Sequence, residues 1–359
     1  MKIFIRVDAS MVIGTGHLNR CLNLADALRL KGCQTLFAIN NASLDLQKKI
    51  TKRGHEIVSF GNDFSTITNT LILENIEQQL LDAKDCSKLL EKYQPDLLIV
   101  DHYNLDYNWE RMLKPLTKSI LVIDDLANRK HECSFLLDQT PVRTSRDYTN
   151  LVEFNTLLLI GPEYTILHPD FAIYRNKKIK NPVSSKNILV GMGGLDSNNL
   201  IPKIVTFLEQ KPELAQYEIN VVISSMATQI RLLEKIIKSS SLRIHLNIEA
   251  QNFVQLLATS EFAICAGGLM SLELACLGVP AIILPLNEIQ SKVSSKLSEE
   301  VDFFIASDWA NNFESTLSAC MDSLLQIPNL NKARRIHTKI DGLGTMRLVD
   351  FIINHATNF

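Results

Sequence analysis

The chain has 359 residues, of which 46% are hydrophobic and 21% are charged, and 37 Lys and Arg against 39 Asp and Glu give a formal net charge of −2. This length predicts two domains of roughly 150–200 residues, and the balanced charge gives no electrostatic basis for binding nucleic acid or an anionic membrane. No apolar run approaches the ~20 residues of a membrane span, and the start MKIFIRVD lacks a secretion signal, so we expect a cytoplasmic protein.

The cysteines indicate neither a disulfide framework nor a metal site. There are seven, they are scattered, and no two form a Cys-x-x-Cys pair. We therefore expect no metal and no cofactor. No feature of the sequence indicates an oligomeric state, and a monomer is compatible with it.

The N-terminal half alternates short apolar runs with helical patterns. Continuous apolar runs such as 97–100 are typical of parallel strands that are covered on both faces. Together with the crossover rule, this pattern predicts a doubly wound α/β domain. Its expected strands are 3–8, 34–40, 56–60, 96–101, 120–124, 135–138 and 157–160, with helices ending near residue 30 and at 44–53 and 77–93.

A glycine turn follows the first predicted strand and opens the first helix. Gly14 and Gly16 let backbone N–H groups approach an anion closely, and the start of a helix favours negative charge. His17 lies in the first helical turn, where the partial positive charge helps to keep its imidazole neutral, as a general base must be. The alternative is a packing turn with a capping or surface histidine.

A polar, basic stretch at 174–182 ends in proline and predicts a boundary. We expect an N-terminal domain at 1–168, a solvated linker at 169–186 and a C-terminal domain at 187–359. The second domain repeats the α/β pattern, with a mostly helical extension from about residue 299. Its expected strands are 187–190, 218–224, 243–248, 262–265 and 281–284, and its helices are 199–209, 229–239, 253–259 and one that ends near residue 278.

Two glycine loops in the second half can each point N–H groups at a diphosphate. One contains Gly193 and Gly194, and the other runs through Gly268 into a helix. Glu273 lies one turn into that helix, where a carboxylate can accept hydrogen bonds from a ribose diol. Its alternative interpretation is a partner of the helix dipole.

Polar residues also follow the strands of the first half. Arg6 and Asp8 end the first strand, Tyr103 follows the strand at 96–101, and Asp125 follows the strand at 120–124. The carboxyl ends of parallel strands are where ligands of such domains bind. We expect Tyr103 to contact a ligand, whereas solvated loops explain any one of these residues taken alone.

Taken together, these segments resemble the PseG/SpsG family of UDP-sugar hydrolases. The resemblance runs from residue 1 to about residue 300 with matching order and spacing. It rests on the runs Arg6-Val7-Asp8-Ala9-Ser10, Ile13-Gly14-Thr15-Gly16-His17, Asp101-His102-Tyr103, Asp124-Asp125, Gly193-Gly194-Leu195-Asp196 with Asn199, and Glu273 with Gln290.

The resemblance implies a GT-B fold similar to MurG, in which two doubly wound Rossmann-like domains face a cleft. It also implies metal-independent hydrolysis of UDP-2,4-diacetamido-2,4,6-trideoxy-β-L-altropyranose to UDP and the free sugar, in pseudaminic acid biosynthesis for a surface or flagellar glycan. His17 matches the proposed base, which activates water for inverting attack at the anomeric carbon. The substrate-binding residues that it implies are Arg6, Asp8, Gly14, Gly16, Arg20, Tyr103, Gly193, Gly194, Ile248 near uracil, Gly268, Leu269 and Met270 at the diphosphate, Glu273 at the ribose, and Gln290.

The sequence departs from the family pattern at three positions. Met270 replaces a hydroxyl residue, Leu195 replaces a small or hydroxyl residue, and Ile289 replaces a frequent asparagine. Backbone contacts tolerate these changes, so they affect the identity of the sugar more than the fold. Two other functions fit the same fold: an inverting GT-B glycosyltransferase that uses a UDP-sugar donor, and a non-catalytic protein that binds a sugar nucleotide.

Overall fold

The computed structural model describes residues 1–9, 15–61, 76–180, 186–327 and 335–356. The chain divides into two compact units. The first comprises Met1–Ile13, His17–Ile166 and Gly344–Phe359, and the second comprises Gly14–Gly16 and Leu167–Leu343. Each unit is described by itself.

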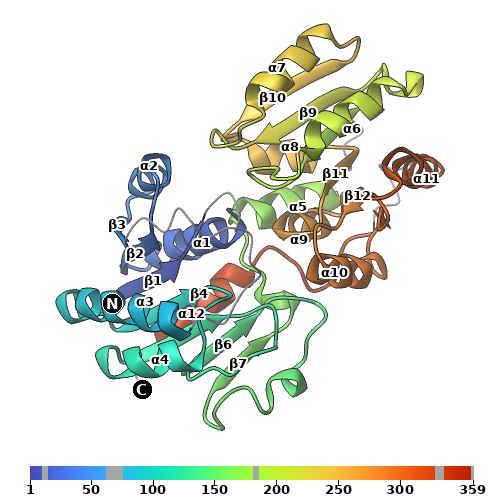
Figure 1. Ribbon diagram of the computed structural model, residues 1–359. Helices are drawn as coiled ribbons and strands as arrows, with labels where there is room; N and C mark the ends of the chain where they lie inside the picture. The colour runs from blue at the N-terminus through green and yellow to red at the C-terminus, as the bar shows by residue number, and fades with distance from the viewer. Residues whose placement is uncertain (10–14, 62–75, 181–185, 328–334, 357–359) are drawn as a thin grey trace. The chain divides into compact units, whose positions relative to one another are not determined.

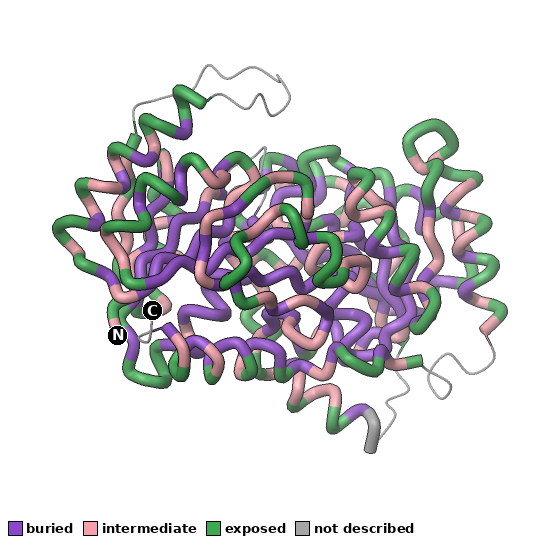
Figure 2. The backbone as a smooth tube through the Cα atoms, turned by 90° about the horizontal axis from the view of Figure 1, so that it is seen from below, coloured by how far each residue is buried: buried purple, intermediate pink, exposed green. Residues whose placement is uncertain are grey.

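The first unit is built on a seven-stranded parallel sheet in the order β3-β2-β1-β4-β5-β6-β7. Strands β1 and β4–β6 consist almost wholly of buried residues, as expected for strands covered on both faces. Buried residues are drawn in purple along the backbone in Figure 2. The strands are β1 (Lys2–Val7), β2 (Gln34–Asn40), β3 (Glu56–Phe60), β4 (Leu97–Asp101), β5 (Ser119–Ile123), β6 (Phe135–Asp138) and β7 (Leu157–Ile160). The helices are α1 (Gly16–Leu30), α2 (Leu44–Lys52), α3 (Ile76–Tyr93), α4 (Tyr107–Leu113) and α12 (Gly344–His355).

The second unit repeats this architecture with a six-stranded parallel sheet in the order β10-β9-β8-β11-β12-β13 (Figure 1). Its strands are β8 (Asn187–Gly191), β9 (Glu218–Ile223), β10 (Arg243–Ile248), β11 (Phe262–Ala266), β12 (Ala281–Leu284) and β13 (Phe303–Ile305). Its helices are α5 (Asp170–Lys180), α6 (Leu200–Glu209), α7 (Ile230–Ser239), α8 (Phe253–Thr259), α9 (Leu269–Leu277), α10 (Glu288–Ser298) and α11 (Phe313–Leu325). The two strand orders confirm the predicted pair of doubly wound, Rossmann-like units.

The predicted linker at 169–186 contains helix α5 of the second unit. Phe171 is buried, and the guanidinium of Arg175 donates to the carbonyl of Cys276 at 2.7 Å and to that of Ile340 at 3.0 Å. Cys276 lies in the last turn of α9, where helix carbonyls lack partners within the helix. This basic segment is therefore a helix, and its Arg175 caps the neighbouring helix α9. It is not the solvated linker that the sequence predicts.

The C-terminal segment was expected to be a mostly helical extension of the second domain, and it differs in containing a strand and in returning to the first unit. After residue 299 the chain first forms β13, which pairs with β12. Helix α12 then belongs to the first unit, where Phe351 packs edge-on against Phe135 at 5.2 Å between ring centroids. The hydroxyl of Ser119 donates to the carbonyl of Ala356 at 3.2 Å. The segment beyond residue 343 thus completes the core of the first unit.

Candidate functional site

In each sheet the strand order reverses between two neighbouring strands, β1 and β4 in the first unit and β8 and β11 in the second. Ligands of doubly wound folds bind outside the carboxyl ends of the strands at this reversal. The segments that follow these strands carry His17 at the start of α1, and Tyr103, Gly193 and Gly268 in loops. The topology therefore places most of the candidate residues where a ligand is expected.

His17 is held by a buried carboxylate. Its Nδ1 lies 2.6 Å from Oδ1 of Asp101, the last residue of β4, and 3.1 Å from Nη2 of Arg20. The shorter, charge-assisted contact favours a proton on Nδ1 that is donated to Asp101. In that tautomer Nε2 carries a lone pair, and none of the described residues is recorded as its hydrogen-bond partner. His17 therefore has the arrangement of an oriented general base.

Arg20 lies behind His17 and is 5% exposed. It donates to both oxygens of Asp101, from Nε at 2.7 Å and from Nη2 at 2.6 Å, and Nη1 donates to Asp125 at 2.8 Å. These charges hold the pKa of Asp101 well below its usual range, against the opposing effect of burial. Arg20 was expected to bind substrate, but its guanidinium is engaged by two carboxylates and supports His17 instead.

Tyr103 lies against the other side of His17. The two rings meet edge-on with 4.5 Å between their centroids, and the tyrosine hydroxyl donates to Oδ2 of Asp125 at 3.1 Å. Burial, followed by the charge of Asp125, raises the pKa of Tyr103 well above its usual value. Tyr103 is therefore a neutral hydroxyl beside the imidazole, as a ligand-contacting residue there requires.

Arg6 and Asp8 form a second buried cluster at the end of β1. Arg6 is 1% exposed and donates to Asp8 at 2.5 Å and to Asp82 of α3 at 2.7 Å. Asp8 also lies 3.1 Å from Nε2 of His102. The predicted contact between Arg6 and the substrate does not fit this geometry, because the carboxylates of Asp8 and Asp82 enclose the Arg6 guanidinium. Asp8 and His102 form the more accessible part of this cluster, since each side chain keeps about an eighth of its surface exposed.

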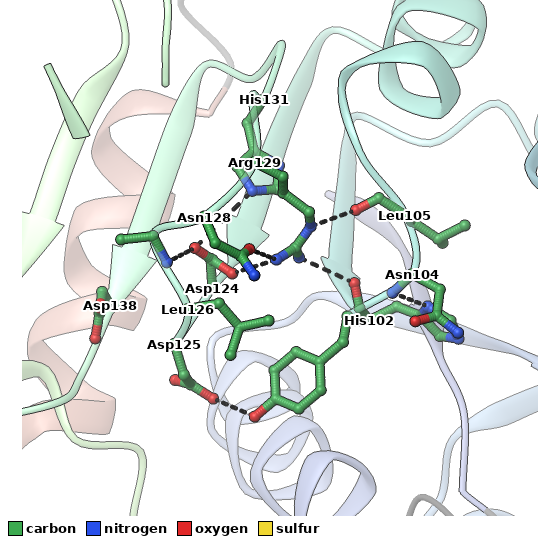
Figure 3. Close-up of polar contacts among 12 residues, drawn as sticks. His102, Asn104, Leu105, Asp124, Asp125, Leu126, Asn128, Arg129, His131 and Asp138 are labelled. Atoms are coloured by element: carbon green, nitrogen blue, oxygen red, sulfur yellow. Dashed lines mark hydrogen bonds and ion pairs between the residues drawn. The ribbon is translucent and has the colours of Figure 1, made fainter. Parts of the chain in front are cut away.

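Arg129 fixes the loop that carries Tyr103, and the sequence interpretation missed it. Its guanidinium donates to Oδ1 of Asp124 at 2.7 Å, to the carbonyl of Leu105 at 2.9 Å and to that of His102 at 3.2 Å (Figure 3). It thereby ties the end of β5 to the loop after β4. An isolated arginine in a polar loop gives no sequence signal of these contacts.

In the second unit, glycines shape both loops. Gly193 has φ +78°, a conformation that side chains disfavour. A Cβ on Gly267 would lie 2.5 Å from the hydroxyl oxygen of Ser294, so α10 packs directly on this backbone. Gly268 begins α9 and no side chain caps that end. The first N–H groups of α9, at Leu269 and Met270, therefore lack partners within the helix and suit an anion.

Glu273 is 8% exposed in α9. Among the described residues, none is recorded as donating a hydrogen bond to its carboxylate, and burial raises its pKa to about 8. A buried carboxyl group without a partner is costly, and it becomes favourable when a ligand supplies donors. This geometry supports the ligand-binding interpretation of Glu273 over that of a helix-dipole partner.

Ile248 ends the edge strand β10 and is 41% exposed. Ile248 is opposite Ile223 of β9, and the N–H of Glu249 donates to the Ile223 carbonyl at 3.0 Å. In a parallel ladder this register turns the N–H and C=O of Ile248 away from β9. The strand end therefore offers one donor and one acceptor at the open edge of the described sheet.

The remaining candidates are placed as follows. Gln290 accepts a hydrogen bond from the N–H of Leu286 at 3.0 Å and lies beside Gly268. Met270 packs on Gly191 at the end of β8, and Leu195 is buried. Gly16 is the first residue of α1. Gly194 lies in the loop after β8, and Ile289 lies in α10. Gly14 lies outside the described residues.

Two possible features have no support in the described part of the chain. No group of three or more His, Cys, Asp or Glu side chains there is arranged to hold a metal ion. None of its helices combines the length and apolar composition needed to cross a membrane.

Comparison with known proteins finds relatives of low identity, and no protein-family model matches the chain. It is 28% identical to the spore coat polysaccharide biosynthesis protein SpsG of Bacillus subtilis, over 84% of this chain and 82% of that protein. It is 26% identical to the UDP-2,4-diacetamido-2,4,6-trideoxy-β-L-altropyranose hydrolase of Campylobacter jejuni, over 72% and 82%. A further relative, the uncharacterized protein MJ1062 of Methanocaldococcus jannaschii, is 26% identical over 81% of this chain, which spans only 57% of that relative's length.

Solved structures share the fold at still lower identity. MurG of Acinetobacter baumannii has a TM-score of 0.61 at 14% identity, covering 98% of this chain and 99% of MurG. The MnaA–UDP structure from S. aureus has a TM-score of 0.65 at 13% identity, covering 100% and 97%. These likenesses confirm the predicted MurG-like GT-B fold, and the curated relatives support a PseG/SpsG-like chain.

Proposed function

We propose that the protein hydrolyses UDP-2,4-diacetamido-2,4,6-trideoxy-β-L-altropyranose to UDP and the free sugar, as a step of pseudaminic acid biosynthesis. In this proposal the first unit supplies the base and the second unit binds UDP. The observation that carries the proposal is the imidazole of His17, whose Nδ1 is held by Asp101 while its Nε2 is left with no recorded partner among the described residues. The similarity to the hydrolase of Campylobacter jejuni supports the choice of substrate.

The reaction follows from these groups. Nε2 of His17 removes a proton from water as the water oxygen forms a bond to the anomeric carbon. The bond between that carbon and the diphosphate oxygen breaks on the opposite face, so the configuration inverts and UDP leaves with the electron pair. The unpartnered N–H groups at the start of α9 stabilise the developing diphosphate charge, so this mechanism needs no strong acid.

The open edge at Ile248 predicts which base is bound. Its N–H is suited to donate to O4 of uracil, and its C=O is suited to accept from N3–H. Cytosine presents a donor and an acceptor in the reverse order, so both contacts would be lost. We expect UDP to bind at least ~10-fold more tightly than CDP, since an unmade buried hydrogen bond costs about 1–3 kcal/mol. Isothermal titration calorimetry with both nucleotides tests this, and equal affinities would rule out base recognition by this edge.

Glu273 predicts recognition of the ribose. Replacing it with glutamine removes a charged acceptor, so we expect Glu273→Gln to weaken UDP binding by about 10- to 100-fold near pH 8. 2′-Deoxy-UDP provides the matched comparison. The parent protein should bind it more weakly than UDP, whereas the variant should bind both nearly alike. If the variant kept the full preference for UDP over 2′-deoxy-UDP, the ribose would have to bind away from residue 273.

An inverting glycosyltransferase is the main alternative, because CalG4, the calicheamicin glycosyltransferase, shares this fold with a TM-score of 0.62 at 12% identity. The two functions differ in the need for an acceptor. A hydrolase releases UDP from its UDP-sugar in buffer alone, and a transferase does so efficiently only when an acceptor is added. Following UDP release by the purified chain without acceptor therefore tests the proposal.

A further inference from the structure

Asp125 holds two of the side chains that border His17. Its carboxylate is 7% exposed and follows the end of β5. Its two oxygens accept from Nη1 of Arg20 at 3.0 and 2.8 Å, and Oδ2 also accepts from the hydroxyl of Tyr103 at 3.1 Å. Its neighbour Asp124 points to Arg129 instead, so the two adjacent carboxylates have different partners (Figure 3).

Both partners of Asp125 touch the imidazole. Nη2 of Arg20 lies 3.1 Å from Nδ1 of His17, and the ring of Tyr103 packs edge-on against it at 4.5 Å. Asp101 is the third recorded neighbour, and it is also bound by Arg20. Without the Asp125 carboxylate, the Tyr103 hydroxyl would lose this hydrogen bond and Arg20 would lose its contacts through Nη1, keeping only those to Asp101.

The net charge of the group formed by His17, Arg20, Asp101 and Asp125 also indicates a role for Asp125. With His17 neutral, Arg20 contributes one positive charge and the two carboxylates Asp101 and Asp125 contribute two negative charges. When His17 takes a proton, these four groups become electroneutral. A neutral side chain in place of Asp125 would leave the protonated cluster with a net positive charge in a buried place, where such a charge is costly.

Asp138, at the end of β6, faces Asp125 from the other side. Burial and the charge of Asp125 raise the pKa of Asp138 to about 7, and Asp138 accepts from the hydroxyl of Tyr148 at 2.8 Å. Burial and the neighbouring carboxylate thus both favour the protonated form of Asp138. Asp125, by contrast, is the carboxylate that both Arg20 and Tyr103 contact.

We propose that Asp125 is a positioning residue for the base His17: it fixes Arg20 and Tyr103 against the imidazole and supplies the negative charge that balances the imidazolium. The inference rests on the proposed role of His17 as the base. It adds a residue that acts on the imidazole through Arg20 and Tyr103.

The test reads the His17 ring directly, by NMR titration of the full chain without substrate, with the signal assigned from its absence in a His17→Gln variant. In Asp125→Asn, which keeps hydrogen-bond acceptors but removes the charge, we expect the midpoint of the His17 titration to fall by about one pH unit. Asp125→Glu, which keeps the charge, should restore most of this shift. Asp125→Ser is a second neutral variant in case the asparagine protein does not fold.

A matched control comes from the same unit. Asp26 accepts hydrogen bonds from Arg53 at 2.8 Å and lies 2.7 Å from Nε2 of His55, which makes a similar arginine, carboxylate and histidine group away from His17. Asp26→Asn should leave the His17 midpoint unchanged.

A fall of about half a unit or more in the neutral variants supports the proposal. A smaller change overturns it, even if Asp125→Asn loses activity. Because the titration needs no substrate, it separates this inference from the proposed function. A parent protein that releases no UDP would refute the hydrolase, whereas the coupling between Asp125 and His17 would still be measured.

Discussion

His17→Gln is expected to lower kcat for UDP release by about 10²–10⁴-fold, the usual contribution of a positioned general base. Glutamine keeps a polar side chain of similar length, but its amide nitrogen is not basic. The affinity for UDP should stay within about twofold, because the proposed nucleotide contacts lie in the second unit. Initial rates of UDP release and calorimetric binding of UDP measure the two quantities.

His245→Gln is the matched control for this variant. Nε2 of His245 lies 2.6 Å from Oε2 of Glu218, so it is also a histidine paired with a carboxylate, but an exposed one at the edge of the second sheet. Its substitution should leave kcat unchanged. A loss of less than about tenfold in His17→Gln would show that the chemistry does not depend on this base.

The nucleotide-free protein should lose stability as the pH rises, because of Glu273. Its folded pKa of about 8 lies above the ordinary 4.5, so the folded state binds the proton more tightly than the unfolded state does. This contribution is complete below about pH 4.5 and is lost as the pH rises through about 8. Its total is on the order of 5 kcal/mol, since each pKa unit corresponds to about 1.4 kcal/mol.

Glu273→Gln removes this dependence. Relative to the parent, we expect the variant to be more stable by about 2–4 kcal/mol near pH 8.5 and to show little gain near pH 5. Urea unfolding at both pH values without nucleotide measures the difference. Glu314→Gln, which changes an exposed carboxylate on α11, should show no such difference. An equal effect of Glu273→Gln at both pH values would mean that this carboxyl is not held protonated by burial.

If both predictions for Glu273 hold, the same carboxyl lowers stability and improves nucleotide binding. A buried acid with no partner in the nucleotide-free chain is a poor structural residue. Its burial becomes favourable when the hydroxyl groups of a ligand donate hydrogen bonds to it. Functional sites commonly contain residues that lower the stability of the ligand-free protein in this way.

Much of the fold could be predicted because its signals are local. Apolar runs such as Leu97–Val100 and the glycine loops that follow the strands predict a doubly wound sheet from short windows of sequence. The exceptions depend on distant contacts. In helix α5, Arg175 bonds to carbonyls 101 and 165 residues further along the chain, and Phe351 of α12 packs on Phe135 of the first unit.

The site was predictable to a similar degree. Glycines and His17 stand out in a continuous stretch, whereas the roles of Arg20 and Asp125 depend on pairing across 105 positions of sequence. A strand-end arginine can contact a ligand or neutralise a carboxylate, and only burial decides between them. Arg6 ends a strand, whereas Arg20 lies in α1 and was given as a substrate-binding residue through the family resemblance. Both are buried, at 1% and 5% exposure, and both are paired with carboxylates.

The most direct measurement is the fate of the water oxygen. UDP release from UDP-2,4-diacetamido-2,4,6-trideoxy-β-L-altropyranose would be run in water enriched in a heavy oxygen isotope, without acceptor, and the UDP analysed by mass spectrometry. We expect UDP to be released without heavy oxygen, because water activated by His17 attacks the anomeric carbon. Heavy oxygen in the diphosphate of UDP, or no release without an acceptor, would contradict it.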